Sequence, residues 1–350
     1  MYVIDQQAIS AQKTHDLSFE KGEYSTYLTS TFPIVEPTYS EFIPLNLLRR
    51  MGKAVKMGIA AALPIINRNQ QVDGIIVGTA NGGLENCIDF LNQIVAYDEG
   101  VLTPTNFVQS TPNALAGQLA LMTKNTGYNS THVNGSLSFE NALIDAKLFF
   151  EASTNITSLL VGSVEEISSY NYHIDILAGR YKKEIISNDQ LIQSNTEGSV
   201  CGEGASFFLL SNSPEHAVAE IVDTTQIIHP LTADLTTLMN VFFEKNQLSM
   251  DAIDLLLLGK NGDNRLDYWY DDFQQIFPET PAINFKQLTG DYRTISGFAT
   301  YLGVQILTGK INGAHPAFNT DFPTNCNNIL IYNHFDGIRH GFILIKKGTR

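Results

Sequence analysis

The stretch "THVNGSLSFENAL" (residues 131–143) is typical of a turn that carries a nucleophile, because a short β-like run ends in Asn-Gly before an amphipathic helix begins. The stretch has no cysteine, so the candidate nucleophile is the hydroxyl of Ser136. A serine hydroxyl needs a general base near neutral pH. His132, four residues earlier, is a candidate for that base. Serine chemistry, an active site elsewhere and a lost active site all remain open at this point.

The charge of the chain limits its partners. A net charge of −14 disfavours nucleic acid, whose phosphates such a surface would repel. A local cluster of cations is the exception, and it could either dock an acidic partner or form a solvated helix face: Arg49, Arg50, Lys53 and Lys56.

No motif in the sequence predicts a metal or a cofactor. The three cysteines are far apart and have no zinc-like spacing: Cys87, Cys201 and Cys326. The Gly-x-Gly of "EGSVCGEGASFFLLSN" (197–212) is not followed by a helix with a lysine, so it is a weak phosphate-loop signal.

The same residues predict a soluble, cytoplasmic protein. A low, odd cysteine count fits a reducing compartment. No apolar run approaches the roughly 20 residues that a membrane span needs. The first residues, "MYVIDQQAIS", do not have the features of a signal peptide.

The elements that position these side chains occur twice. "VDGIIVGTANGG" begins at Val72 and "IDLLLLGKNGDN" at Ile253, and each is an apolar run ending in a glycine turn with Asn-Gly. Such runs predict strands buried on both faces. Each copy is followed by strand, loop, amphipathic helix and strand: 130–135, 138–152 and 156–163 in the first, and 281–285, 293–310 and 327–337 in the second. We therefore expect a layered α/β protein with two similar halves, 1–212 and 213–350, and a loop-rich connector at 171–196.

Several segments, in order, resemble the β-ketoacyl synthases, which have the thiolase fold. "LLRRMGKAVKMGIAAALPII" (47–66) is similar to an early helix of that family, and "STPNALAGQLALMTKNTGY" (110–128) to its Pro-Asn-x-x-Ala-Gly helix. "EGSVCGEGASFFLL", "FKQLTGDYRTISGFATYLGVQIL" and "NHFDGIRHGFILIKK" resemble later motifs of the family. The resemblance runs from about residue 45 to the C-terminus and implies a layered α-β-α-β-α architecture.

The resemblance also shows where this chain departs from the family. A ketosynthase uses a cysteine nucleophile and two histidines, since a thiolate attacks the thioester and imidazole N–H groups stabilise the enolate. By alignment these positions hold Ser136, Asn261 and Asp291, and only the lysine remains, as Lys286. Asparagine cannot take a proton, and an aspartate anion has the wrong sign to stabilise an enolate. Condensation by this chain alone is therefore not expected. A Ser-His-Asp arrangement of Ser136, His132 and Asp291 is the alternative that these aligned positions leave open.

What the resemblance implies instead is a non-catalytic subunit of the chain-length-factor type. Such a subunit pairs with an active ketosynthase, shapes the tunnel for the growing chain and meets an acyl carrier protein. Phe107 and Phe139 are the expected tunnel residues, whereas Phe150 is expected in the core, and Arg49, Arg50 and Lys53 are the expected carrier-docking residues. Polyketide or fatty-acid-type synthesis is the expected context, with aryl polyene or flexirubin pigments as a narrower case. Two alternatives remain: an acyl hydrolase or acyltransferase using Ser136, and an acyl-binding scaffold homodimer.

Overall fold

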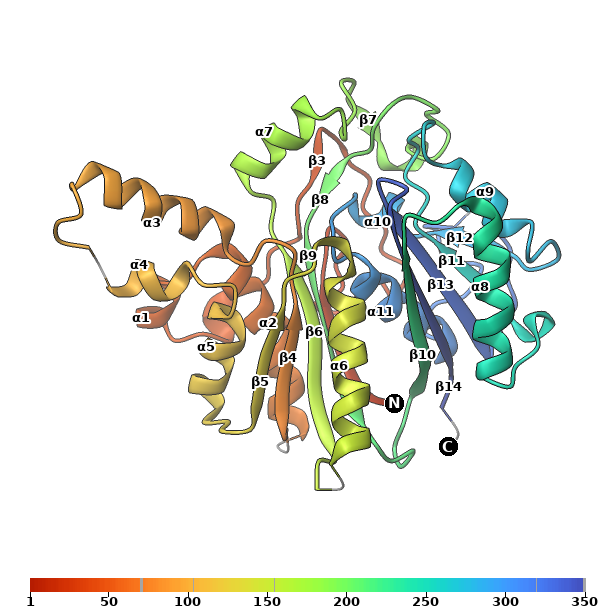
Figure 1. The fold of residues 1–350 in the computed structure, drawn as a ribbon, viewed down its shortest axis with the longest axis horizontal. Coiled ribbons are helices and arrows are strands. Elements are labelled where there is room, and N and C mark those ends of the chain that lie inside the picture. Colours follow the sequence, from red (N-terminus) through yellow and green to blue (C-terminus); the bar gives the residue numbers. More distant parts are fainter. Residues whose placement is uncertain (70–71, 103, 154, 319, 349–350) are drawn as a thin grey trace.

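Two sets of five strands with the same spatial order build this protein, as the computed structural model shows (Figure 1). The structure describes residues 1–69, 72–102, 104–153, 155–318 and 320–348. From its outer edge inward, the first set runs β5–β4–β6–β9–β1, and the second runs β12–β11–β13–β14–β10. A short antiparallel contact between β1 and β10 joins the two sets into one ten-stranded sheet.

The strand directions repeat as well as the order. The first set consists of β1 (Tyr2–Ile9), β4 (Gly74–Gly78), β5 (Tyr128–His132), β6 (Ser158–Glu165) and β9 (Gly204–Ser211). The second consists of β10 (Ala219–Ile228), β11 (Leu255–Leu258), β12 (Ala282–Asn284), β13 (Asn328–Phe335) and β14 (Arg339–Lys347). In both sets the outer three strands are parallel and the inner two pairings are antiparallel. The predicted duplication is therefore confirmed, while the division at residues 212 and 213 stays a prediction.

Helices form three layers around the two sets of strands. The helices α6 (Ser138–Ala152) and α11 (Ser296–Leu307) share one core cluster with strands of both halves. All twelve residues of α11 are buried, as expected for a helix at the centre of a protein. The helices α2 (Lys53–Asn69) and α5 (Ala114–Thr123) cover the outer face of the first half, and α8 (Thr232–Lys245) and α9 (Tyr268–Gln274) cover that of the second. The predicted α-β-α-β-α layering is confirmed.

The remaining elements are short or lie at the periphery. They are α1 (Leu45–Leu48), α3 (Leu84–Ala96), α4 (Pro104–Gln109), α7 (Ser169–Leu177) and α10 (Lys286–Thr289). Two small ladders join β2 (Leu28–Thr29) to β7 (Ile186–Ser187) and β3 (Thr31–Phe32) to β8 (Cys201–Gly202). Single 3₁₀ turns lie at η1 (Tyr39–Glu41), η2 (Gly135–Leu137), η3 (Asn188–Gln190) and η4 (Met250–Ala252).

Two local expectations differ from the structure. The segment 47–66 is not one helix but α1 and α2, which are separated at Gly52, a residue of low helix propensity. The connector 171–196 is not only loop, because α7 extends into it. Within the described residues, none of the helices combines the length and the apolar character that crossing a membrane requires.

Candidate functional site

Three of the four predicted site residues lie together. Asn261 follows the end of β11, Lys286 is the first residue of α10, and Asp291 follows α10. Asn261 Nδ2 donates a hydrogen bond to Asp291 Oδ2 at 2.7 Å, and Lys286 Nζ lies 3.0 Å from Asp291 Oδ1. Parallel strands of one half bring their carboxyl ends to the same edge, which explains why loops after β11 and β12 meet here.

The charges in this trio are mutually satisfied. The Lys286 side chain is only 1% exposed and that of Asp291 is 14% exposed. A buried ammonium is tolerated only with a close counter-ion, and Asp291 supplies it. Since each oxygen of Asp291 has a donor from Asn261 or Lys286, the carboxylate serves as a counter-ion rather than as a free base.

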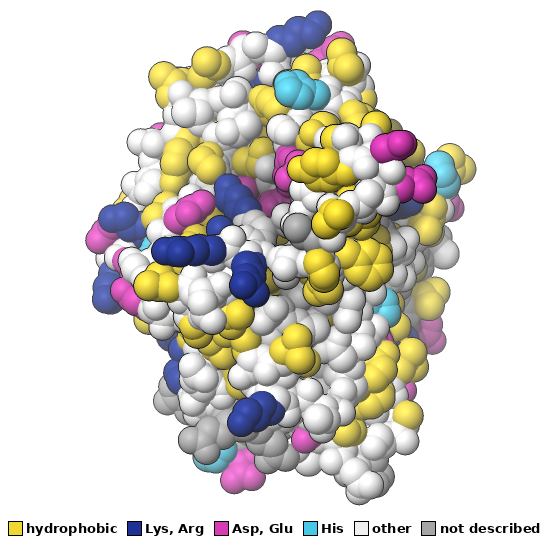
Figure 2. Space-filling model, turned by 90° about the vertical axis from the view of Figure 1, so that its left-hand side faces the viewer, with side chains coloured by type: hydrophobic (Ala, Val, Ile, Leu, Met, Phe, Trp, Pro, Cys, Tyr) yellow, Lys and Arg dark blue, Asp and Glu magenta, His cyan; other side chains and the backbone are white. Residues whose placement is uncertain are grey.

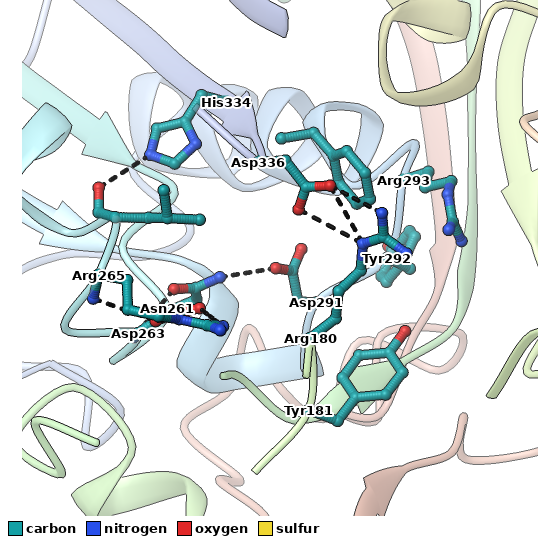
Figure 3. A pocket seen from close by; sticks show the side chains of 12 residues that line it. Arg180, Tyr181, Asn261, Asp263, Arg265, Asp291, Tyr292, Arg293, His334 and Asp336 are labelled. Atoms are coloured by element: carbon teal, nitrogen blue, oxygen red, sulfur yellow. Dashed lines mark hydrogen bonds and ion pairs between the residues drawn. The ribbon is translucent and has the colours of Figure 1, made fainter. Parts of the chain in front are cut away.

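A pocket opens above Asn261 and Asp291, and charged and aromatic side chains line it (Figure 3). Its lining residues come from four parts of the chain: Arg180, Tyr181, Asn261, Asp263, Arg265, Leu266, Asp291, Tyr292, Arg293, His334, Phe335 and Asp336. Each arginine is paired with an aspartate, namely Arg180 with Asp336, Arg265 with Asp263, and Arg293 with Asp175 just behind the pocket. Because cations and carboxylates balance, the pocket has no strong preference for a charged ligand.

His334 is the histidine of this pocket, and sequence reasoning did not select it. Burial holds its pKa well below the usual range, so the ring is neutral. Gly337 N donates to Nδ1 at 3.3 Å, which leaves the proton on Nε2, where it is donated to the carbonyl of Leu266 at 3.3 Å. Both ring nitrogens are therefore used internally. The segment "NHFDGIRHG" contains this residue, and its resemblance to a family motif is a signal that could have pointed to it.

Ser136 lies apart from these residues, in the 3₁₀ turn before α6. It is buried, its Oγ has no hydrogen-bond partner within the described chain, and it does not line the pocket. His132 Nε2 instead lies 2.8 Å from Asp145 Oδ2. The Ser-His-Asp arrangement that the sequence left open is thus not assembled, because His132 and Asp291 each pair elsewhere.

The backbone conformation of the turn before Ser136 also favours glycine, and a side chain there would require Arg339 to move. Gly135 has a φ of +57°, which favours glycine. A Cβ atom there would lie 2.1 Å from Nη1 of Arg339, and this guanidinium donates to the carbonyl of Asn134 at 3.3 Å. The turn keeps the sharp geometry expected of it, but an arginine from β14 fills the space beside it.

The two predicted tunnel phenylalanines have different environments. Phe139 is fully buried in the core between the two sets of strands, where its ring centroid lies 5.8 Å from that of Phe208. Phe107 is 60% exposed on α4 and meets Phe90 edge-on at 5.8 Å. Within this chain, Phe139 is a core residue and Phe107 a surface residue. Phe150, expected in the core, is partly buried and packs against it.

The three predicted docking cations also have different environments. Arg49 and Arg50 are exposed between α1 and α2, and their side chains pair with none of the described residues. Lys53 Nζ lies 2.6 Å from Oε1 of Glu203, which is fully buried. The Lys53 charge therefore neutralises a buried carboxylate, and its role in carrier docking stays a prediction.

A buried carboxyl group near the site makes stability depend on pH. Burial raises the pKa of Glu140, in the first turn of α6, to about 7 from the ordinary value of 4.5. The folded state therefore binds more protons than the unfolded state between these values, and stability falls as pH rises through this window. In the Glu140→Gln variant, the loss of stability that Glu140 causes as pH rises should disappear. Thermal unfolding should give a higher midpoint than the unmodified protein at pH 8 and a similar midpoint at pH 4.5.

The matched control for this variant is Glu151→Gln, an exposed position on the same helix. Its midpoint should follow that of the unmodified protein at every pH. Equal pH profiles for Glu140→Gln and the unmodified protein would contradict the assignment.

Within the described residues, no group of three or more His, Cys, Asp or Glu side chains could hold a metal ion. The candidate site thus consists of the trio Asn261, Lys286 and Asp291, the pocket beside it and the separate turn at Ser136.

Comparisons with known proteins agree on one family. Residues 30–176 match the family described as the β-ketoacyl synthase N-terminal domain. No curated protein has a significantly similar sequence.

Solved structures extend the likeness to the whole chain. A β-ketoacyl synthase from Burkholderia phymatum has a TM-score of 0.80 at 15% identity, with 100% of this chain and 99% of that chain covered. The ishigamide ketosynthase/chain length factor gives 0.77 at 14% identity, covering 99% and 98%. A ketosynthase in complex with its chain length factor from Xenorhabdus doucetiae gives 0.76 at 15% identity, covering 99% and 97%. Residues 30–176 thus match the β-ketoacyl synthase N-terminal domain, and the chain as a whole has the thiolase-type fold of the ketosynthases.

Proposed function

We propose that this chain is a non-catalytic subunit of the chain-length-factor type, which pairs with an active β-ketoacyl synthase during polyketide or fatty-acid-type chain assembly. The observation that carries the proposal is the trio of Lys286, Asp291 and Asn261. At the positions where the family resemblance expects histidines, the chain has Asn261 and Asp291. These two residues are hydrogen-bonded to each other, and Asp291 forms an ion pair with Lys286. A synthesis of aryl polyene or flexirubin pigments is the narrower form of the proposal.

The cysteine next to the site is not a substitute nucleophile. Cys201 is buried, and the backbone N–H of its neighbour Gly202 donates to the carbonyl of Asp291. Burial raises the pKa of Cys201 to about 12, so the group stays a thiol at neutral pH. Since the thiolate is the nucleophilic form, this residue is inert.

An exposed apolar surface supports the proposed pairing. The strand β5 forms a free edge of the sheet, and α3 and α4 extend beyond it as a lobe (Figure 1). No residue of α3 is buried. Figure 2 shows this side of the molecule, where patches of hydrophobic side chains lie beside a group of Lys and Arg side chains. The exposed apolar residues of α3, α4, α5 and the neighbouring turns are Leu91, Val95, Tyr97, Val101, Phe107, Val108, Leu121 and Val133, which we call the lobe surface.

Exposed apolar side chains that lie on neighbouring elements are a feature of surfaces that bind another protein. The neighbour from Xenorhabdus doucetiae is a ketosynthase bound to its chain length factor, which supports a thiolase-fold partner for this chain too. Arg49 and Arg50 are the cations left free for an acidic carrier protein in this proposal.

Two assays test the proposal together. The purified chain is incubated with acyl and malonyl thioesters of a carrier protein, and intact mass and carbon dioxide release are measured. No adduct on Ser136 and no decarboxylation are expected. The chain is then co-expressed with a ketosynthase from the same genome that has an intact Cys-His-His set, and a 1:1 complex is expected by native mass spectrometry. A solitary homodimer with condensing activity of its own would overturn the proposal.

The pairing surface has its own prediction. Leu91→Glu, in the middle of α3, should weaken the 1:1 complex by roughly tenfold or more, because it places a charge where an apolar side chain would be desolvated. The matched control is Val241→Glu on α8, which has similar exposure but lies on the other half of the molecule. Equal weakening by both variants, or by neither, would argue against the lobe surface as the contact.

The two alternatives give different results in the same assays. An acyl hydrolase or acyltransferase would show an adduct that disappears in Ser136→Ala. The buried, unpartnered Oγ of Ser136 disfavours this outcome. An acyl-binding scaffold would form a homodimer that retains lipid without any ketosynthase.

A further inference from the structure

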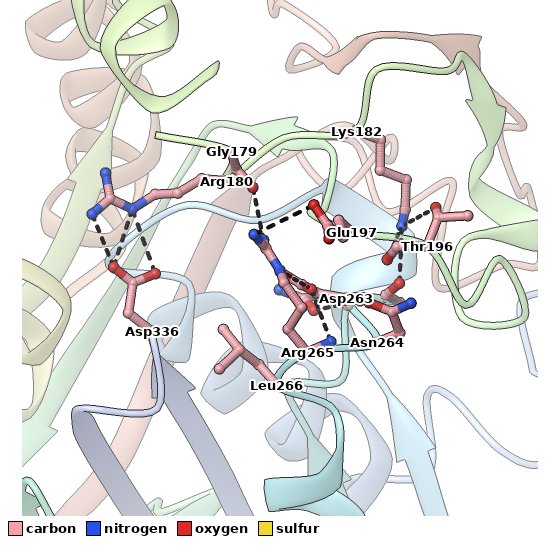
Figure 4. Close-up of polar contacts among 12 residues, drawn as sticks. Gly179, Arg180, Lys182, Thr196, Glu197, Asp263, Asn264, Arg265, Leu266 and Asp336 are labelled. Carbon is pink, nitrogen blue, oxygen red and sulfur yellow. Dashed lines mark hydrogen bonds and ion pairs between the residues drawn. The ribbon is translucent and has the colours of Figure 1, made fainter. Parts of the chain in front are cut away.

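A short segment of chain crosses the pocket that contains Asn261 and Asp291. This segment, Gly179–Lys182, which we call the strap, follows α7 (Figure 4). At its start, Arg265 Nη2 donates to the carbonyl of Gly179 at 2.7 Å. At its end, Lys182 Nζ donates to the carbonyl of Gly262 at 2.9 Å. The strap is thus held to the loop after β11 at two points.

Arg180 fastens the opposite side of the strap. Its Nη2 and Nε donate to Oδ2 of Asp336 at 2.9 and 3.1 Å, and its Nη1 donates to Asp175 at 2.8 Å. Arg293 Nη2 donates to both oxygens of Asp175 at 3.1 Å. The two guanidinium carbons lie 5.5 and 5.0 Å from the ring centroid of Phe335. Arg180 therefore connects the strap to the turn between β13 and β14.

Polar contacts, rather than apolar packing, hold α7 and the strap in place. Of the nine residues of α7, only Asp175 is buried, whereas Ile174 and Leu177 are exposed. A segment with so little buried apolar area opens at low free-energy cost. The Arg180 and Asp336 side chains are themselves about one third exposed, at 33% and 31%. Their ion pair is therefore a fastening of the segment that solvent and salt can reach.

We propose that α7 and the strap form a lid over the pocket, with the Arg180–Asp336 ion pair as its latch. When the latch opens, the segment lifts and the side chains of Asn261 and Asp291 become accessible from solvent. Arg180 stays paired with Asp175 while this happens because both belong to the lid, whereas the contact of Asp175 with Arg293 breaks. The lid is a property of this chain, whether or not it pairs with a ketosynthase.

Labelling of an engineered cysteine tests the lid. Asn261→Cys is introduced together with Cys87→Ser, since Cys201 and Cys326 are buried and Cys87 is partly exposed. The rate of reaction with a small maleimide then reports the fraction of open lid. Asp336→Asn should raise the rate about fivefold, the ratio that corresponds to roughly 1 kcal/mol for one partly exposed ion pair. Higher salt should raise the rate in the latched protein, since such a pair is screened.

A control and a second probe keep the test decisive. Lys260→Met breaks the pair of Lys260 with Asp271, 2.7 Å apart and outside the pocket, and should leave the rate unchanged. Leu266→Cys, another lining position, replaces Asn261→Cys if the latter does not fold. Hydrogen exchange of residues 169–182 should also become faster in Asp336→Asn. Equal labelling rates with and without the latch, or a rate equal to that of a fully exposed cysteine, would overturn the proposal.

Discussion

Asp291→Ala should lower the free energy of unfolding by about 3 kcal/mol, because it leaves the ammonium of Lys286 buried without a counter-ion. Removing one member of a buried pair typically costs about 3–5 kcal/mol, and the partial exposure of Asp291 places the effect at the lower end. The variant also removes the acceptor of Asn261 Nδ2, so a second buried polar group loses its partner. Urea unfolding followed by circular dichroism measures the change.

Two further variants show whether the loss comes from the buried charge. The double variant Lys286→Met and Asp291→Leu removes both charges and should recover most of the stability, since an apolar pair of similar volume replaces the ion pair. Asp271→Ala breaks the exposed pair with Lys260 and should cost less than about 1 kcal/mol. If Asp291→Ala cost no more than Asp271→Ala, the counter-ion role of Asp291 would be wrong.

The repeated core strands were predictable from the sequence because their signal is local. The runs at Ile75–Val77 and Leu255–Leu258 are buried on both faces, so every position had to be apolar and no alternation obscured the pattern. The helix at 138–152 was likewise predictable, and its bounds match α6, because one face carries Leu143 and Ala146 at helical spacing.

The contacts within the site were less predictable, because they join residues that are distant in sequence. The sequence indicated Asn261 and Asp291 as substituted site positions and Lys286 as a retained one, but not that they bond to one another. Arg180 and Asp336 lie far apart in the sequence, and no spacing rule connects them. The helix α7 was missed since a mixed, mostly polar segment with exposed isoleucines has no clear apolar face.

Phe139→Ala should have the other large effect, a loss of about 3–5 kcal/mol in the free energy of unfolding. Its side chain is fully buried in the core between the two sets of strands, so truncation leaves a cavity that the surrounding layers cannot close. A tunnel role makes the opposite prediction. A phenylalanine that only limits the length of a growing chain would, when shortened, change the product of the ketosynthase complex and leave stability almost unaltered.

Phe107→Ala is the matched variant, since sequence reasoning gave both phenylalanines the same role. At 60% exposure on α4 it should change the free energy of unfolding by less than about 1 kcal/mol. Because Phe107 belongs to the lobe surface, its loss should instead weaken the 1:1 complex with a ketosynthase. Urea unfolding of the free subunit and titration of the complex separate the two effects. If Phe139→Ala were stable and altered product length, Phe139 would lie on a tunnel wall. If Phe107→Ala were destabilised, the lobe would pack on the body of its own chain.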